Sequence, residues 1–253
     1  MNATPVLVAE HPGRMVGARL WRIASCDSTN ALMQRERDVF RPGDAVRAEV
    51  QTAGRGRCGR AWFTAPGALA CTLLVTAHGD QPARMPMLMG LGLIRWLATH
   101  RVVAQLKWPN DVYWAGRKLA GILSEGEAAG PAWRVRAGLG LNVRVAADEF
   151  PPAVRPLATS LAAAGLALAP EAALAELLPV LDAVWREDRA GGWPALRAEA
   201  ERHLLWRGGR VRVTMGDRTL TGTVGGLAAN GGLCVDNETI MAGDVTPLTE
   251  NVA

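Results

Sequence analysis

The sequence has few cysteines, and their arrangement neither crosslinks the chain nor binds a metal. No Cys-x-x-Cys pair occurs, and the four cysteines lie far apart, at Cys26, Cys58, Cys71 and Cys234. The four histidines are equally scattered and lack the spacing of metal ligands. This pattern is typical of reduced thiols in a cytosolic protein, and it argues against a disulfide-stabilised secreted domain.

Long apolar runs are also missing. The apolar stretches are interrupted by Gly, Arg or Pro and are too short to span a bilayer. The N-terminus lacks the basic and then apolar order of a signal peptide. We therefore expect a cytoplasmic protein. Its net charge of +4 is a small excess that is compatible with an anionic ligand such as a nucleotide, or with nucleic acid.

The length of 253 residues suits one large domain, or a large domain with a small one. Periodicity and turn residues predict an α+β domain over residues 1–205 and a small β-barrel over residues 206–253. In the first domain we predict strands over residues 18–24, 45–50, 68–75, 103–107, 119–125 and 133–142. Helices are predicted over residues 27–40, 85–97, 171–184 and 193–205, the first capped by Asp27, Ser28 or Thr29 and the third kinked by Pro179.

One short stretch, QTAGRGRCGRAW at residues 51–62, concentrates positive charge. Three arginines alternate with three glycines between residues 54 and 60, so the stretch can neither pack into a core nor form a stable helix. Glycine lets backbone N–H groups approach an oxygen closely, and arginine adds planar donors that stay charged. The loop therefore suits a phosphate chain together with a carboxylate. The alternative is a solvated basic loop, or one that grips nucleic acid.

The same loop matches the dinucleotide-binding pattern G-x-G-x-x-G at residues 54–59, and Asp80 lies about twenty residues further on. That pattern binds a pyrophosphate only where a helix begins inside it. Residues 62–67 instead lead through Pro66 and Gly67 into a predicted strand. A Rossmann-type site, and with it an NAD-dependent dehydrogenase, is therefore disfavoured.

Three further segments carry polar residues at strand ends: KWPND (residues 107–111), RKLAGILSE (117–125) and GLGLN (138–142). Lys107 ends a strand as a point cation, and Asn110 and Asp111 are predicted in the following turn. Asp111 is expected to orient a neighbouring lysine or arginine. The two glycines that flank Leu139 indicate close approach of a ligand or of another backbone.

Together with STN at residues 28–30, these segments resemble the biotin protein ligase family in motif, order and spacing, over nearly the whole chain from about residue 18. The resemblance implies a class II synthetase-like biotin–lipoate ligase domain, with a mixed sheet and flanking helices, followed by an SH3-like β-barrel. It also implies a two-step reaction. Biotin and ATP give biotinyl-5′-AMP and pyrophosphate, and a lysine of a biotin carboxyl carrier protein then takes the biotinyl group and releases AMP.

The resemblance also implies roles for individual residues. Lys107 and Arg57 are implied as catalytic. The implied biotin-binding residues are Ser28, Thr29, Asn30, Gln51, Arg55, Gly56, Arg57 and Lys107. The implied ATP- and adenylate-binding residues are Arg55, Arg57, Arg60, Trp62, Lys107, Asn110, Lys118 and Asn142. Mg²⁺ is expected with ATP, although no ligand for the ion is legible in the sequence.

Two alternatives to a biotin ligase stay open. A lipoate–protein ligase would share the fold and the adenylate chemistry, and a non-catalytic module could bind nucleic acid with the basic loop and the barrel. Residues 1–17, which precede the first predicted strand, are too few for the helix-turn-helix of the family's repressors. We therefore expect a ligase without a DNA-binding domain, acting as a monomer or homodimer on an apo carrier protein of acetyl-CoA carboxylase or a related carboxylase, with no DNA or membrane partner.

Overall fold

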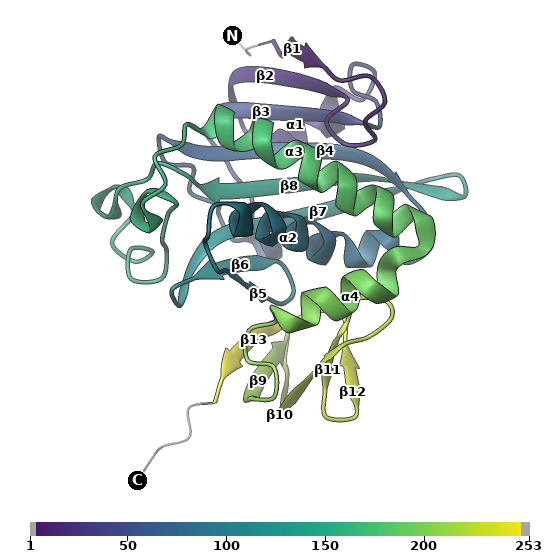
Figure 1. The fold of residues 1–253 in the computed structure, drawn as a ribbon, viewed down its shortest axis with the longest axis vertical. Coiled ribbons are helices and arrows are strands. Elements are labelled where there is room, and N and C mark those ends of the chain that lie inside the picture. The colour runs from purple at the N-terminus through teal and green to yellow at the C-terminus, as the bar shows by residue number, and fades with distance from the viewer. Residues whose placement is uncertain (1–3, 249–253) are drawn as a thin grey trace.

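The computed structural model describes residues 4–248 and contains two sheets connected through helices (Figure 1). The larger sheet has eight strands in the order β1-β2-β3-β4-β8-β7-β6-β5. Among these strands β2 and β3 are parallel, and each other neighbouring pair is antiparallel, so the predicted mixed sheet is confirmed. The strands are β1 Val6–Glu10, β2 Arg19–Cys26, β3 Asp44–Gln51, β4 Ala68–Ala77, β5 Gln105–Lys107, β6 Asp111–Trp114, β7 Arg117–Ala129 and β8 Ala132–Asn142.

Two strands were not predicted from the sequence. Strand β1 pairs with β2 and precedes the strand that we predicted as the first. Strand β6 begins at Asp111, which was expected in a turn, and pairs with both β5 and β7. Such short strands show too few alternations for periodicity to reveal them. The pairing of Lys107 with Asp111 closes a tight hairpin and fixes where the residues between them lie.

The described residues form four α-helices: α1 Thr29–Arg35, α2 Gln81–Thr99, α3 Pro170–Glu187 and α4 Trp193–Arg202. The first three pack on the larger sheet, and α4 packs on α2 and on the second sheet. In Figure 1, α2 and α3 cross the near face of the sheet, and α1 lies behind it. Helix α1 stops at Arg35, several residues before the predicted end near Phe40. Helix α3 continues through Pro179 as one element, and the predicted kink there stays a prediction. Because helices cover both faces, almost every residue of the central strand β4 is buried.

The core between α2, α3 and the sheet explains the Met- and Trp-rich stripe of residues 85–97. The residues that repeat at helical spacing in this stretch are all buried, which confirms a helix that faces the core. They are Met85, Leu88, Met89, Gly92, Leu93, Trp96 and Leu97. Two glycines let α2 approach its neighbours closely. A Cβ at Gly92 would lie 2.6 Å from a Leu181 methyl group on α3, and one at Gly90 would lie 2.6 Å from Leu106 on β5. Helix α2 therefore presses directly onto β5, the strand that ends at Lys107.

The second sheet has five antiparallel strands in the order β12-β11-β10-β9-β13. Its strands are β9 Arg210–Met215, β10 Arg218–Leu227, β11 Leu233–Val235, β12 Glu238–Ile240 and β13 Asp244–Pro247. The predicted small β-domain is confirmed, but β12 and β13 do not pair with each other in the described residues, so these pairings do not close a barrel. We keep the boundary between residues 205 and 206 as a proposal. Leu205 still pairs with Leu106 of the first sheet, and β9 begins at Arg210.

Within residues 4–248, no helix combines the length and the apolar character that crossing a membrane would require.

Candidate functional site

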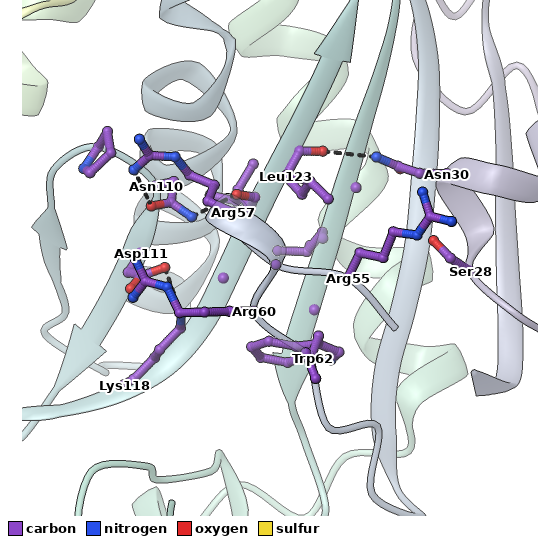
Figure 2. Close-up of a pocket in the computed structure, with 18 of the residues that line it drawn as sticks. Ser28, Asn30, Arg55, Arg57, Arg60, Trp62, Asn110, Asp111, Lys118 and Leu123 are labelled. Carbon is purple, nitrogen blue, oxygen red and sulfur yellow. Dashed lines mark hydrogen bonds and ion pairs between the residues drawn. The ribbon is translucent and has the colours of Figure 1, made fainter. Parts of the chain in front are cut away.

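A cavity of about 150 Å³ opens on the sheet face that carries α1 (Figure 2). It lies between the start of α1, the Gly/Arg loop, the β5–β6 turn and strands β7 and β8, and β13 of the second sheet reaches its rim. All of the predicted site residues except Asn142 line it. Those residues are Ser28, Thr29, Asn30, Gln51, Arg55, Gly56, Arg57, Arg60, Trp62, Lys107, Asn110 and Lys118.

Asn142 ends β8 away from this cavity. Its side chain is buried, and its amide donates to the carbonyl of Thr159 at 2.9 Å. The residue thus ties the end of β8 to the segment that precedes α3. The structure does not bring it together with the other predicted residues.

The Gly/Arg loop is a short hairpin. The Trp62 N–H donates to the Gly54 carbonyl at 2.9 Å, and the Gly56 N–H donates to the Arg60 carbonyl at 2.7 Å. The tip is a single turn of 3₁₀ helix at Arg57–Gly59, and β4 follows, so no α-helix begins in the G-x-G-x-x-G pattern. This bears out the rejection of a dinucleotide site.

One glycine of the hairpin also has a structural role. A Cβ at Gly54 would lie 2.6 Å from the Trp62 carbonyl oxygen, so only glycine lets the two arms close. The N–H of Gly56 donates within the hairpin. In Figure 2, Arg55 extends toward Ser28, and Arg57 extends toward Asn110.

One end of the cavity is neutral, polar and tightly hydrogen-bonded. Gln51 accepts at Oε1 from the Thr29 N–H at 2.8 Å and from the Thr29 hydroxyl at 3.1 Å. The Thr72 hydroxyl lies 2.7 Å from Thr29 Oγ1 and 2.6 Å from Asn30 Oδ1, and its single proton can go to one of them at a time. Ser28 is the N-cap of α1, yet its side chain makes no capping hydrogen bond, which corrects the predicted cap.

Asn30 is held from three directions. Its amide nitrogen donates to the Leu123 carbonyl at 3.1 Å and to a Glu125 carboxylate oxygen at 2.7 Å, and its oxygen lies against Thr72. A Cβ at Gly138 would lie 2.7 Å from Asn30 Oδ1, so this glycine gives the amide its place. Both N–H donors are thus engaged, and one lone pair of the oxygen is left for a ligand.

The second glycine of GLGLN makes room for an indole. A Cβ at Gly140 would lie 2.2 Å from Trp62 Cε2, and one at Gly121 would lie 3.1 Å from the same ring system. The nearest neighbours that Gly138 and Gly140 admit are therefore side chains, Asn30 and Trp62, rather than another backbone. The Trp62 indole N–H is buried and has no hydrogen-bond partner among the described residues. Such a donor is costly to leave unmatched, which points to a ligand acceptor at this place.

The other end of the cavity is cationic. Lys118 Nζ lies 5.6 Å from the centre of the Trp62 ring and pairs with Asp111 at 2.7 Å, which confirms that Asp111 orients a lysine. Arg60 binds both carboxylate oxygens of Asp244 on β13, at 2.7 and 2.6 Å. This hydrogen-bonded pairing holds the pKa of Asp244 below its usual range. Asp244 could not have been found from the sequence, because nothing near it marks a contact with residue 60.

Two cations of this end have no carboxylate partner within the described residues. Arg57 donates to Asn110 Oδ1 at 3.3 Å, and Asn110 is in turn anchored by donating to the Ile122 carbonyl at 2.8 Å. Lys107 Nζ lies 5.4 Å from the ring centre of Tyr113 and 5.5 Å from that of Trp206. Burial lowers the pKa of Lys107, and the nearby Asp111 and Asp244 partly offset that effect. A negatively charged ligand would restore what burial costs.

The residues that were not predicted are mainly those that hold the predicted site residues in place. Thr72 is a polar residue inside the buried stretch ALACTLLV, and that contrast could have marked it. Tyr113 and Trp206 flank Lys107 from β6 and from the connection to the second sheet. No sequence signal links these two residues to Lys107.

The comparisons with known proteins agree with this geometry. Residues 23–142 match the model of the biotin/lipoate A/B protein ligase family, and residues 208–246 match that of the biotin protein ligase C-terminal domain. A biotin–[acetyl-CoA-carboxylase] ligase of Mycobacterium tuberculosis is 35% identical over 251 residues, which cover 90% of each chain.

Two further relatives differ in how much of them the chain covers. The bifunctional ligase/repressor BirA of Bacillus spizizenii is 29% identical over 205 residues, which are 79% of this chain and 61% of that protein. The structure of a biotin protein ligase from Aquifex aeolicus in complex with biotin and ATP matches with a TM-score of 0.75 and 25% identity, over 90% of this chain and 97% of that one.

Proposed function

The chain belongs to the biotin protein ligase family, and from that premise we propose that it attaches biotin to a lysine of a biotin carboxyl carrier protein. In the first step the biotin carboxylate attacks the α-phosphorus of ATP, which gives biotinyl-5′-AMP and pyrophosphate. In the second step the carrier lysine attacks the acyl carbon, and AMP leaves. The observation that carries the proposal is one cavity with a neutral hydrogen-bonding end and, at the other end, cations without carboxylate partners.

The cationic end meets the main electrostatic obstacle of the first step. A carboxylate must approach a polyphosphate, and two like unit charges about 4 Å apart repel by roughly 4 kcal/mol at an effective dielectric constant of 20. Arg57 and Lys107 line the cavity and pair with no carboxylate in the described residues. We propose that both contact the biotin carboxylate and the α-phosphate, cancel this repulsion and stabilise the charge that develops on the phosphoryl oxygens.

The neutral end is the proposed site of the ureido ring of biotin. Ser28, Thr29, Asn30 and Gln51 converge there, and their mutual hydrogen bonds fix their orientation before a ligand binds. A ring that carries both donors and a carbonyl needs partners of both kinds. The hydroxyl of Ser28 and the remaining lone pair of Asn30 are the proposed ones, and Arg55 and Gly56 close the pocket along the valeryl chain.

The nucleotide is proposed to lie over Trp62. Its indole face, its unmatched N–H and the Lys118 ammonium above the ring form one surface. Arg60 and Asn110 would contact the phosphates beside it. Asn142 was predicted for the same role and stays a proposal, but its amide would first have to leave the Thr159 carbonyl.

Mg²⁺ is proposed to arrive on the phosphates of ATP. Both carboxylates that line the cavity, Asp111 and Asp244, are engaged in ion pairs. Among residues 4–248 no group of three or more His, Cys, Asp or Glu side chains is placed to hold a metal ion. Mg²⁺ typically uses one or two carboxylates together with substrate phosphates, so this site fits an ion that comes with its substrate.

The proposed partner is the apo form of a biotin carboxyl carrier protein, such as that of acetyl-CoA carboxylase, which the name of the mycobacterial relative supports. The proposed compartment is the cytoplasm. All four cysteines are free thiols, which supports a reducing environment.

Pyrophosphate exchange into ATP tests the first step, run with biotin and, in parallel, with lipoate. Labelled biotin with an apo carrier domain tests the second. We expect exchange and transfer with biotin and none with lipoate. Exchange that depends on lipoate and not on biotin would show that the protein is a lipoate–protein ligase instead. Salt-sensitive nucleic-acid binding without any exchange would favour the non-catalytic alternative.

A further inference from the structure

A second cavity, of about 190 Å³, adjoins the first. The two share Arg57, Trp108, Pro109, Asn110 and Ile122 as lining residues, so this group of side chains forms a common wall. Beyond the wall, the second cavity is bounded by the first turns of α2 and by residues of the second sheet. The reaction as described so far makes no use of this space.

The lining of the second cavity offers both apolar and polar contacts, as an aliphatic stem with a polar end requires. Pro82, Pro86 and Met87 line it from α2, and Met241 lines it from the connection between β12 and β13. Among the described residues that line it, Arg57 is the one that carries a charge, and two uncharged polar side chains lie beside it. A lysine side chain is a four-carbon stem with one nitrogen at its end and needs apolar walls along most of its length.

The common wall has a movable part. Asn110 is anchored to the Ile122 carbonyl at 2.8 Å, whereas Arg57 reaches Asn110 at 3.3 Å, beyond the usual range of such hydrogen bonds. Figure 2 shows Arg57 extending from the tip of the hairpin toward Asn110. A small displacement of the Arg57 side chain would therefore connect the two cavities next to the proposed position of the biotin carboxylate.

We propose that the second cavity is the access route of the acceptor lysine, an inference that depends on the proposed ligase function. The lysine would enter between α2 and the second sheet and meet the acyl carbon from the side opposite to the nucleotide. The Arg57 charge disfavours the ammonium form, so the amine arrives neutral after releasing a proton to solvent. Its nitrogen forms the amide bond to the acyl carbon. The bond from that carbon to the phosphate oxygen breaks, AMP leaves with the electron pair, and the surplus amine proton is lost.

Bulky substitutions at the rim test this route without touching the first cavity. Ala83→Trp on the exposed start of α2 and Met241→Trp in the connection between β12 and β13 would each narrow the second cavity from a different element. Ala98→Trp near the exposed end of the same helix is the matched control. Biotin-dependent pyrophosphate exchange reports folding and the first step in every variant.

Three acceptors separate the route from the docking of the carrier: hydroxylamine, Nα-acetyl-lysine amide and an apo carrier domain. In both rim variants we expect exchange and the reaction with hydroxylamine to stay within about twofold of the parent protein. Transfer to Nα-acetyl-lysine amide and to the carrier should fall about tenfold or more, because the stem can no longer reach the acyl carbon. The control should keep all three reactions.

Two results would overturn the route. One is unchanged transfer to Nα-acetyl-lysine amide in both rim variants. The other is an equal loss with hydroxylamine and with Nα-acetyl-lysine amide. If the unaltered protein shows no biotin-dependent exchange, the proposed function fails instead, so the two failures are distinguishable.

Discussion

The two ends of the first cavity are built in different ways. At the neutral end Thr29, Asn30 and Gln51 are buried or half-buried. Gln51 accepts from Thr29, and Thr72 connects Thr29 with Asn30. At the cationic end the side chains are longer and less constrained. Arg57 has one contact at 3.3 Å, and the pair of Arg60 with Asp244 is more than half exposed on both sides.

This contrast separates recognition from chemistry. A fixed set of donors and acceptors rejects a ligand that lacks the matching groups, because buried polar atoms would stay unpaired. Cationic side chains that bind a polyanion must instead follow it through the reaction. They bind the substrate, stabilise the charge that develops on the phosphoryl oxygens and release the products. We therefore expect substitutions at the neutral end to act on biotin affinity, and those at the cationic end to act on the rate of adenylate formation.

The largest effect should come from the cations without carboxylate partners. Lys107→Ala and Arg57→Ala each remove a charge aimed at the reacting phosphate, and loss of one such group typically costs about 10²–10³ in rate. Pyrophosphate exchange at saturating biotin and ATP measures this. Biotin affinity, followed by calorimetry without ATP, should change far less than the rate. Variants that still form the adenylate at the parent rate would remove the basis of the comparison.

The pH dependence of the same reaction sharpens this assignment. Burial lowers the pKa of Lys107 below the ordinary value of 10.5, so its charge is lost at a lower pH than that of an exposed lysine. If the charged form is required, exchange at subsaturating biotin and ATP, which reports the free protein, should decline as the pH rises through that lowered pKa. An arginine stays charged there, so the residual activity of Lys107→Arg should keep its rate to a higher pH. An alkaline limb at the same pH in both proteins would show that another group titrates.

Two glycines on the same strand allow a matched comparison of the two ends. A Cβ at Gly140 would collide with Trp62 at 2.2 Å, whereas one at Gly138 would collide with Asn30 at 2.7 Å. Overpacking of this kind costs about 1–3 kcal/mol, roughly tenfold or more in the affinity for the ligand that uses the displaced side chain. We expect Gly140→Ala to weaken ATP binding and Gly138→Ala to weaken biotin binding. Equal losses for both ligands in both variants would contradict a division between the ends.

Most residues that line the first cavity could be predicted from the sequence, because they fall in short contiguous motifs. STN, the Gly/Arg loop and KWPND each place several of them at one strand end or helix start, and the fold brings these ends together. The supports could not be predicted in this way. Thr72 acts on Asn30 from a neighbouring element, and Asp244 reaches Arg60 from the second sheet. Such contacts depend on tertiary packing, which local patterns do not encode.

Helix α1 illustrates the same limit within the fold. Its predicted cap uses Ser28, Thr29 or Asp27 because those residue types commonly cap helices. In the structure, Oε1 of Gln51 on β3 accepts from the Thr29 N–H. The capping rule predicted the correct start of the helix. It could not identify Gln51 as the acceptor, because Gln51 lies more than twenty positions away in the sequence.

A smaller effect is expected from Thr72→Val, which keeps the shape of the side chain and removes its hydroxyl. The change leaves Asn30 Oδ1 without its donor in a fully buried place, which costs about 1–3 kcal/mol of stability. Biotin affinity should fall with the loss of orientation, while the rate of exchange at saturating biotin should stay near that of the parent. Denaturant unfolding and calorimetry measure the two effects. Thr76→Val on the same strand is the control, and an equal response there would show that the neutral network has no special role.

The smallest effect should come from Asp244→Asn, which breaks the pair that links the hairpin to the second sheet. Both partners are more than half exposed, and pairs of that kind contribute about 0–1 kcal/mol. The KM for ATP should therefore change by no more than about fivefold at this energy. The folded-state pKa of Asp244 lies below its ordinary 3.8, so the stabilisation is present above that value and is lost as the pH falls through the lowered pKa. The parent and the variant should thus differ in stability near neutral pH and converge in acid. Asp244→Asn could instead reduce the rate of exchange as strongly as Lys107→Ala. That result would show that the second sheet takes part in the chemistry, and it would contradict a division of roles between the two ends of the cavity alone.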